Sequence, residues 1–391
     1  MDNLRIGVIG IGNMGSGHAR RMVAGKVPGA VLTAVCDINP KRRAWAEKNL
    51  GEDVQLFENS DDFFAAEVVD AVVIAVPHYD HPPLAIKAFD KNLHVLCEKP
   101  AGVYTKQVQE MNEKAAASDR IFALMFNQRQ RPLHQKAREL IASGELGEIM
   151  RTNWIISTWF RSQAYYDSGG WRASWRGEGG GVLLNQCPHN LDLWQWICGM
   201  PSRVRAFCEF GKYHDIEVED DVTAFVQYKN GATGLFVTTT GEAPGTNRLE
   251  IVGERGKLLM ENGKLTFWRT RENVRTYTET TKKSFASPEC WKCEIPVSGK
   301  GEEHLGVLKN WANAIRNGEE LLSPGEEGLH SLELSNAMLL SAWQDDWVDL
   351  PIDDELFFKE LDKRIQTSRY DKAKAEDQQE EEATDLSGSF G

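Results

Sequence analysis

The feature that most constrains the fold is a glycine-rich turn close to the N-terminus. An apolar run, LRIGVIG, covers residues 4–10, the motif Gly-Ile-Gly-Asn-Met-Gly covers residues 10–15, and a helical pattern continues to Val23. A GxGxxG motif is weak evidence by itself, but between a strand and a helix it is typical of dinucleotide-binding domains. The sequence therefore predicts a strand–turn–helix unit that binds a nucleotide.

The glycines of this motif have separate roles in such a unit. Gly10 permits the tight turn, Gly12 lets the backbone approach a pyrophosphate, and Gly15 lets the helix pack closely on the strand. The free amides at the start of the helix, where Asn13 and Met14 lie, favour phosphates together with the positive end of the helix dipole. We expect these five residues to form the phosphate side of the cofactor site.

The first 126 residues alternate short apolar runs with helical stretches. After the first strand, the runs cover residues 30–37, 70–76, 94–97 and 121–126. Strands rich in β-branched residues that alternate with helices are typical of a doubly wound parallel sheet. We expect residues 1–126 to form a Rossmann-type α/β domain.

An acid at the end of the second strand indicates which dinucleotide binds. Asp37 closes the segment TAVCD, about 20 residues after the glycine motif, as the fingerprint requires. A carboxylate at this place accepts hydrogen bonds from the adenosine ribose and repels a 2′-phosphate, so NAD is expected and NADP is less favoured. Three neighbouring cations would weaken that preference: Lys41, Arg42 and Arg43.

Two further strand ends carry polar residues toward the same crevice. The third strand ends in AVPHYDH and the fourth in LCEKP, and ligands of open α/β sheets bind outside the carboxyl ends of the strands. We therefore expect Pro77, His81 and Glu98 beside the cofactor. Lys99 is expected at the nicotinamide, where an ammonium can donate to a substrate hydroxyl and stabilise the alkoxide as hydride leaves. A plain salt bridge between charges at the strand end is the alternative.

After residue 126 the pattern becomes that of an α+β domain. A series of short strands joined by Gly and Asn turns runs from 203 to 269, and helical stretches are expected at 133–143, 182–198, 302–317 and 325–344. The strand series predicts one large open antiparallel sheet. We expect a substrate-binding and oligomerisation domain over residues 127–366, followed by an acidic, flexible tail over 371–391.

Composition argues against several kinds of partner. The net charge of −13 disfavours nucleic acid and anionic membranes. No apolar run approaches the ~20 residues of a membrane helix, and the N-terminus lacks the layout of a signal peptide.

Most of the seven cysteines lie in apolar runs, as expected of thiols in the reducing cytoplasm. Cys290 and Cys293 form a CxxC without the second pair that zinc requires, so no metal is expected.

A second group of polar residues follows three glycines at 179–181. In GGGVLLNQCPHNLD, Asn185, His189 and Asp192 are spaced i, i+4 and i+7, which places them on one face of the helix predicted over 182–198. An imidazole with an ordinary pKa near ~6.5 can take a proton at neutral pH. Removal of hydride from an alcohol carbon also requires removal of the hydroxyl proton. His189 is therefore a candidate base, and a buried core histidine is the alternative.

These motifs together resemble one family. GVIGIGNMG, AVPHYDH, CEKPAG and GGWRASWRGEGGGVLLNQCPHNLDLWQW are similar to segments of the glucose–fructose oxidoreductase, inositol dehydrogenase and rhizopine-catabolism (Gfo/Idh/MocA) oxidoreductases, and the resemblance covers residues 4–352. It implies a Rossmann domain, an open-faced antiparallel sheet domain, and NAD(P)-dependent oxidation of a secondary alcohol of a sugar or cyclitol. It also implies a homo-oligomer, a dimer or tetramer formed through the open sheet.

The resemblance implies that three positions surround the reacting hydroxyl. Lys99 and His189 match the family pattern, but the family has an aspartate where this chain has Asn185. An amide can orient a hydroxyl but cannot hold a proton or charge. The pattern therefore favours His189 as the base and Lys99 as the hydroxyl donor.

Other positions are expected to complete the pocket. The resemblance implies a contact between Arg172 and the nicotinamide side of the cofactor, although Trp175-Arg176 repeats the Trp171-Arg172 dipeptide. Gln128 follows the fifth strand, where the family places pocket residues, and Tyr165 is expected to contact substrate. Flat aromatic faces and forked donors suit a pyranose, and more of them lie nearby: Tyr79, Trp159, Phe160, Arg161 and Tyr166.

The segment around Cys-Pro-His looks most similar to bacterial enzymes that oxidise the C3 hydroxyl of glucosides. We therefore expect NAD-dependent oxidation of a ring hydroxyl, at C3, of a glucose-type sugar or glycoside. One alternative is a redox-assisted glycosidase, which oxidises, eliminates and reduces, and which needs a base near C2 such as Tyr165, Tyr166 or Asp192. Further alternatives are an inositol dehydrogenase and a nucleotide sensor without turnover; a sensor would need neither Lys99 nor His189.

Overall fold

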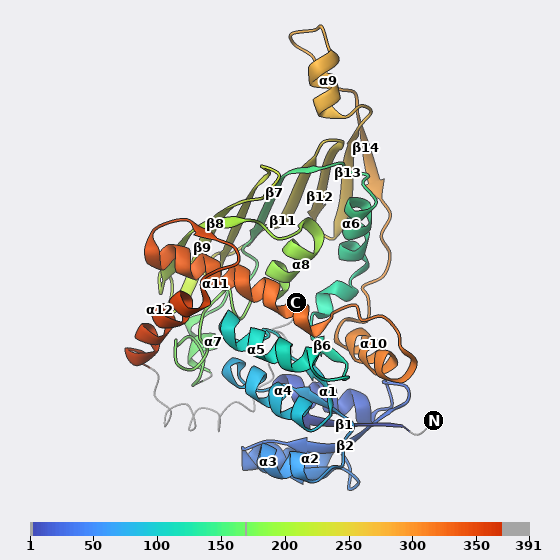
Figure 1. Cartoon of the computed structure of the whole chain (residues 1–391), viewed down its shortest axis with the longest axis vertical. Coiled ribbons are helices and arrows are strands. Elements are labelled where there is room, and N and C mark those ends of the chain that lie inside the picture. The colour runs from blue at the N-terminus through green and yellow to red at the C-terminus, as the bar shows by residue number, and fades with distance from the viewer. Residues whose placement is uncertain (1–2, 169, 370–391) are drawn as a thin grey trace.

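The computed structural model describes residues 3–168 and 170–369. These residues form two β-sheets with helices packed on them, and α11 (Gly328–Gln344) lies between the two layers (Figure 1). The predicted tail, 371–391, lies outside the described residues.

The first sheet is parallel and has the strand order β3-β2-β1-β4-β5-β6. Its strands are β1 (Leu4–Ile9), β2 (Ala30–Cys36), β3 (Gln55–Phe57), β4 (Ala71–Ile74), β5 (His94–Cys97) and β6 (Phe122–Leu124). Every residue of β4 is buried, as expected of a strand covered on both faces. The predicted Rossmann-type fold is confirmed. The sequence pattern does not predict β3, because three residues are too few to show a period.

Five helices cover this sheet: α1 (Asn13–Val23), α2 (Pro40–Asn49), α3 (Ser60–Ala65), α4 (His81–Asp90) and α5 (Thr105–Ala116). Helix α1 begins directly at the glycine turn, with Gly12 as its N-cap. Helix α2 begins where the Asn39 side chain accepts a hydrogen bond from the Lys41 amide and Pro40 occupies the first helical position. Both helices therefore start at the carboxyl edge of the sheet.

One helix from late in the chain packs on the first sheet. Helix α10 (Glu303–Asn317) buries Val307, Leu308 and Trp311 in the same apolar cluster as Ile6 of β1. Its first residues thereby reach the carboxyl edge of the sheet. The boundary predicted at residue 126 stays a prediction.

The second sheet has the strand order β14-β13-β12-β11-β7-β10-β9-β8-β15. All neighbouring strands pair antiparallel except β7 and β10, which are parallel. The predicted open sheet is confirmed with this one parallel pair. Its strands are β7 (Ile149–Ile156), β8 (Arg203–Phe210), β9 (Glu219–Gln227), β10 (Thr233–Thr239), β11 (Asn247–Gly253), β12 (Gly256–Glu261), β13 (Lys264–Thr270), β14 (Cys290–Ile295) and β15 (Val348–Asp349).

Helices cover one face of this sheet. Trp194 of α8 (Pro188–Cys198) stacks on Phe236 of β10 with ring centroids 5.3 Å apart, and α11 contacts α8, β8 and α5. The opposite face carries exposed aromatic residues, Phe207 and Phe225. The remaining helices are α6 (Pro132–Ala142), α7 (Gln163–Asp167), α9 (Val274–Thr280), which projects from the top of the view in Figure 1, and α12 (Asp354–Gln366).

The helix predicted over 182–198 is shorter than expected. It begins at Pro188, and residues 182–187 form turns. Proline at the first helical position favours a start at that point. The prediction that Asn185, His189 and Asp192 share one helical face is therefore wrong for Asn185, which precedes the helix.

Candidate active site

A cavity of about 930 Å³ opens at the carboxyl ends of β1, β2, β4 and β5 and extends to the turn before α8. It brings together nearly all the predicted site residues, whose roles stay predictions. Its wall includes Gly10, Gly12, Asn13, Met14, Asp37, Pro77, His81, Glu98, Lys99, Gln128, Tyr165, Arg172, Asn185 and His189.

The glycines of the fingerprint lie at one end of this cavity. A Cβ atom at Gly12 would meet no atom within 4 Å, so the backbone there faces open space. Gly10 has a φ of +83°, and a Cβ atom on it would lie 2.5 Å from the Ala75 carbonyl oxygen. Gly15 lies outside the cavity wall and packs on the turn, where a Cβ would approach the Gly10 oxygen to 1.8 Å. This open backbone cradle at a helix N-terminus fits a pyrophosphate.

Asp37 is fixed in orientation by the backbone. Its Oδ2 accepts a hydrogen bond from the Ile11 amide at 2.8 Å, and its Oδ1 accepts one from the Asn39 amide at 2.8 Å. Arg43 donates to the carbonyl oxygens of Asp37 and Ile38, so its guanidinium is directed to the backbone. Of the three neighbouring cations, only Arg42 lies on the cavity wall.

Lys99 extends from the end of β5 across the cavity to the second domain. Its Nζ donates to the backbone carbonyl of Asn185 at 2.9 Å, and two ammonium hydrogens remain for other acceptors. Burial lowers the pKa of Lys99, although Glu98 and Glu178 act against that shift. The simple strand-end salt bridge does not form, because Glu98 pairs instead with His18 of α1 at 2.8 Å.

His189 lies on the same wall, in the first turn of α8. Within the described part of the chain, its buried Nδ1 has no hydrogen-bond partner. Burial, followed by the charge of Lys99 and of other nearby cations, holds the pKa of His189 well below its usual range. The imidazole is therefore neutral at pH 7 and able to accept a proton.

Asp192 lies away from the cavity. Arg129 donates to both of its carboxylate oxygens, in a pair that is almost completely buried, and Arg129 also pairs with Glu327. Tyr166 is likewise occupied, because its hydroxyl bonds to Thr240 at 2.8 Å. As bases near C2, these two residues are therefore excluded, and only Tyr165 lines the cavity.

His81 lies on the wall, but its ring nitrogens are directed to the backbone. They lie 2.7 Å from the Pro100 carbonyl oxygen and 2.8 Å from that of Val76. These contacts join the ends of β4 and β5. No ring nitrogen of His81 is thus left to bind a nucleotide.

Aromatic and cationic side chains line the substrate end. Arg172 donates to the Tyr165 hydroxyl at 3.0 Å, and the guanidinium of Arg161 lies 5.1 Å from the Tyr165 ring and 5.8 Å from that of Trp159. In the repeated dipeptide only Arg172 faces the cavity, since Arg176 is exposed and donates to the Ile365 carbonyl.

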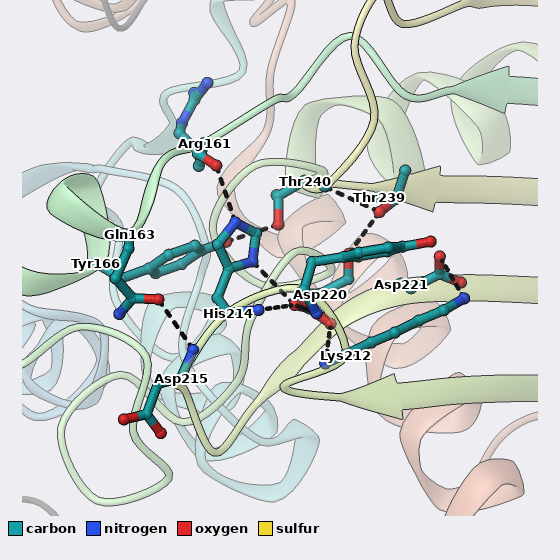
Figure 2. A network of polar contacts seen from close by, with 12 residues as sticks. Arg161, Gln163, Tyr166, Lys212, His214, Asp215, Asp220, Asp221, Thr239 and Thr240 are labelled. Carbon is teal, nitrogen blue, oxygen red and sulfur yellow. Dashed lines mark hydrogen bonds and ion pairs between the residues drawn. The ribbon is translucent and has the colours of Figure 1, made fainter.

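A polar network holds the backbone of Arg161 (Figure 2). His214 bonds through Nε2 to the Arg161 carbonyl and through Nδ1 to Asp220, both at 2.9 Å. The Arg161 amide donates to the Thr240 carbonyl at 2.8 Å. Figure 2 shows the Arg161 side chain pointing away from this network. The sheet thereby fixes the position from which the guanidinium reaches the cavity.

Three residues near the site were not predicted from the sequence. His18 pairs with Glu98 from the helix after the glycine motif, and His304 reaches the cavity from the start of α10. Glu178 lies within the glycine-rich turn, where it accepts hydrogen bonds from the Ala173 amide and from the Asn185 side chain. Glu178 stands three residues before Gly181, so its place in the glycine-rich segment was a usable sequence signal. The sequence around His18 and His304 contains no such signal.

The described residues offer neither a metal site nor a membrane-spanning helix. Among residues 3–168 and 170–369, no group of three or more His, Cys, Asp or Glu could hold a metal ion. Cys290 and Cys293 lie three residues apart on β14, so their side chains point to opposite faces. No helix in the described part of the chain is long and apolar enough to cross a membrane.

Comparisons with known proteins identify the family of this chain. Residues 4–126 match the family model described as "Oxidoreductase family, NAD-binding Rossmann fold", and residues 134–259 match the "GFO/IDH/MocA C-terminal domain". The chain is 25% identical to levoglucosan dehydrogenase of Pseudarthrobacter phenanthrenivorans, over 90% of this chain and 99% of that protein. It is 24% identical to myo-inositol 2-dehydrogenase of Thermotoga maritima, over 85% of this chain and 95% of that protein.

Two solved structures share the fold of this chain. The WlbA dehydrogenase from Bordetella pertussis, in complex with NADH and UDP-GlcNAcA, has a TM-score of 0.76 and 27% identity, and it covers 90% of this chain and 100% of its own. Levoglucosan dehydrogenase in complex with NADH and levoglucosan shares the fold, with a TM-score of 0.75 and 21% identity over 90% of this chain and 100% of its own. The chain is an NAD-binding oxidoreductase, and it belongs to the Gfo/Idh/MocA family.

Proposed function

We propose that this enzyme uses NAD to oxidise a ring secondary hydroxyl, at C3, of a glucose-type sugar or glycoside. The observation that carries the proposal is that Lys99 and His189 line one cavity together with the nucleotide cradle. The whole-length relatives named for levoglucosan and myo-inositol support a polyhydroxylated ring as the substrate.

The nucleotide would be held by the open backbone at Gly12, the amides at the start of α1 and the fixed carboxylate of Asp37. Bound NAD supplies the acceptor for the hydride. Asp37 is directed by two backbone amides, so it can accept from a ribose diol without reorganisation.

His189 takes the proton of the substrate hydroxyl. It is neutral at pH 7, and its buried Nδ1 has no partner among the described residues. Lys99, held by the Asn185 carbonyl, donates to the same oxygen and stabilises the alkoxide as hydride leaves the carbon. The aromatic side chains of Trp159 and Tyr165 offer flat faces to the ring, and Gln128 and Arg161 offer donors.

A substrate screen tests this proposal. The purified protein is incubated with NAD and with glucose, simple glucosides, plant glycosides or inositols, and the absorbance of NADH is followed. We expect NADH from at least one glucoside, with product oxidised at C3. Turnover of inositols alone would favour the inositol dehydrogenase alternative, for which the Thermotoga maritima relative is the specific support.

The redox-assisted glycosidase remains the second candidate. Of the three bases considered near C2, Tyr165 alone lines the cavity, and Arg172 and Gln186 both donate to its hydroxyl. Release of the aglycone without net NADH would identify this reaction.

We further propose a cytoplasmic homo-oligomer. All seven cysteines are free thiols, which fits a reducing compartment. Phe207 and Phe225 lie exposed on the same open face of the second sheet, where a second copy of the chain would cover them. Light scattering of the purified protein tests the oligomer, and a monomer at micromolar concentration would contradict it.

A further inference from the structure

Glu178 is a buried acid that the proposed chemistry does not use. It is 2% exposed and lies behind the cavity wall, in the turn before α8. Its Oε2 accepts a hydrogen bond from the Ala173 amide at 2.6 Å, and its Oε1 accepts one from the side-chain amide of Asn185. Burial raises the pKa of Glu178, whereas Arg172 and the donors on its two oxygens act in the opposite direction and favour the ionised carboxylate.

Asn185 connects this acid to Lys99. The NH₂ group of Asn185 must face Glu178, because a carboxylate only accepts hydrogen bonds, and this turns its Oδ1 away from the acid. The backbone carbonyl of Asn185 accepts from the Lys99 ammonium at 2.9 Å. Asn185 thus binds Glu178 through its side-chain amide and Lys99 through its backbone carbonyl, so the acid holds the residue to which the ammonium is anchored.

The charge of Glu178 also reaches Lys99 directly. Burial lowers the pKa of Lys99, and Glu98 and Glu178 are the two acids that act most strongly against it. Glu98 is already engaged with His18. Glu178 is therefore the acid on the substrate side that favours the ammonium form of Lys99.

A second buried acid in the same region provides a contrast. Glu219 of β9 is fully buried and accepts hydrogen bonds from the backbone amides of Gly181 and Leu183, at 2.9 and 3.0 Å. These contacts fix the backbone of the glycine-rich turn. Glu178 differs because it contacts a side chain of the cavity wall, so its contacts go beyond holding the turn.

We propose that Glu178 is a positioning residue of the active site: through the Asn185 side chain it holds the residue whose backbone carbonyl binds Lys99, and it places a negative charge behind the wall on that side of Lys99. The proposal rests on the proposed role of Lys99, and it is independent of which alcohol is oxidised.

The test exchanges the two functional groups. Glu178→Gln keeps the size of the side chain and removes its charge, and Glu178→Gln combined with Asn185→Asp returns the charge to the other side of the same hydrogen bond. Amine-reactive labelling of Lys99 is measured against pH by peptide mass spectrometry in the full-length protein. An opposite charge at short range shifts a pKa by about 1–3 units. We therefore expect Lys99 to titrate about one pH unit lower in Glu178→Gln and to recover in the double variant.

Three comparisons control this experiment. Lys106, which is half-buried and pairs with Glu355, should titrate identically in every variant. Glu219→Gln should lower the melting temperature without moving the Lys99 titration, because Glu219 contacts backbone amides. Asn185→Asp alone places two carboxylates across one hydrogen bond, so one of them takes a proton and the site keeps a single charge. The Lys99 titration should then match that of the unaltered protein. An upward shift would show that Glu178 carries no charge, which keeps the proposal testable if Glu178→Gln does not fold.

The proposal is overturned by an unchanged Lys99 titration in Glu178→Gln, by an equal shift in Glu219→Gln, or by no recovery in the double variant. On any substrate that turns over, the alkaline limb of kcat/KM should follow the labelling. If no alcohol is oxidised, the proposed function fails, but the labelling still decides the role of Glu178.

Discussion

The two ends of the cavity are held by different kinds of group. At the nucleotide end, backbone atoms form the surface: Gly12 faces open space, and two amides fix Asp37. At the substrate end, side chains from distant segments meet, with Lys99 at the end of β5 and His189 at the start of α8. The backbone end depends on one local motif, whereas the side-chain end depends on how two domains pack. Changes at the first should therefore affect cofactor binding, and changes at the second should affect chemistry.

The largest expected effect is at the substrate end. Loss of a positioned acid–base group costs about 10²- to 10⁴-fold in rate, so His189→Ala and Lys99→Met should each lower kcat by that amount. Affinity for NADH, followed by fluorescence titration, should change less than about threefold, since the cradle is built by other residues. A parallel loss of NADH affinity in His189→Ala would show that the two ends are not separate.

Two glycines test the nucleotide end. A side chain at Gly12 meets no protein atom, so Gly12→Val should leave the melting temperature of the nucleotide-free protein unchanged but weaken NADH binding by about 100-fold, because the side chain occupies the place of the pyrophosphate. Gly15→Val is the matched control. There the Cβ would lie 1.8 Å from the Gly10 oxygen, and overpacking costs about 1–3 kcal/mol, so stability should fall. Equal melting temperatures for the two variants would contradict this assignment.

Asp37 should determine the preference between NAD and NADP. Asp37→Ser removes the charge that repels a 2′-phosphate, and a hydrogen bond to a charged group contributes about 1.5–3 kcal/mol. We expect NADH affinity to fall about tenfold or more while NADPH affinity rises, because Arg42 remains on the cavity wall. Calorimetric titration with both cofactors measures the change. An unaltered NADH-to-NADPH ratio would mean that Asp37 does not contact the ribose.

The smallest effect concerns pH. Burial and nearby cations hold the pKa of His189 well below 6.5, so its base form persists as the pH falls through 6.5. We expect kcat/KM to stay level from pH 8 down to 6.5 and to decline only below that. On the alkaline side, burial lowers the pKa of Lys99 below 10.5, so activity should decline before that pH. An acid limb centred at or above pH 6.5 would exclude His189 as the base in this environment.

The contrast between a local motif at the nucleotide end and distant side chains at the substrate end explains which features the sequence predicts. The glycine motif, Asp37 and the strand ends are local, so a fixed spacing places them in the fold, and the structure places them on one cavity wall. The prediction that Asn185 and Asp192 share one helical face required a helix from residue 182, but the helix begins at Pro188. Asp192 pairs with Arg129 and does not face the cavity. Helix boundaries depend on local caps, but the partner of a buried acid depends on tertiary packing.

Contacts between residues that lie far apart in the sequence could not be predicted from sequence patterns. His304 comes to the cavity because α10 packs in the same apolar cluster as β1, and His18 of α1 pairs with Glu98, which follows β5. Nothing in the periodicity of either segment specifies these contacts. Asn185 was recognised from the sequence as a departure from the family pattern, but its hydrogen bond to Glu178 is visible only in the folded turn.

The central claim is that Lys99 and His189 act on one alcohol carbon beside the nicotinamide. The most direct measurement uses a methyl glucoside with deuterium at C3, incubated with the enzyme and NAD, followed by mass spectrometry of the reduced cofactor. The account predicts that NADH carries the deuterium with the unaltered enzyme and that its formation is lost in His189→Ala. NADH without deuterium, or undiminished transfer in His189→Ala, would contradict it.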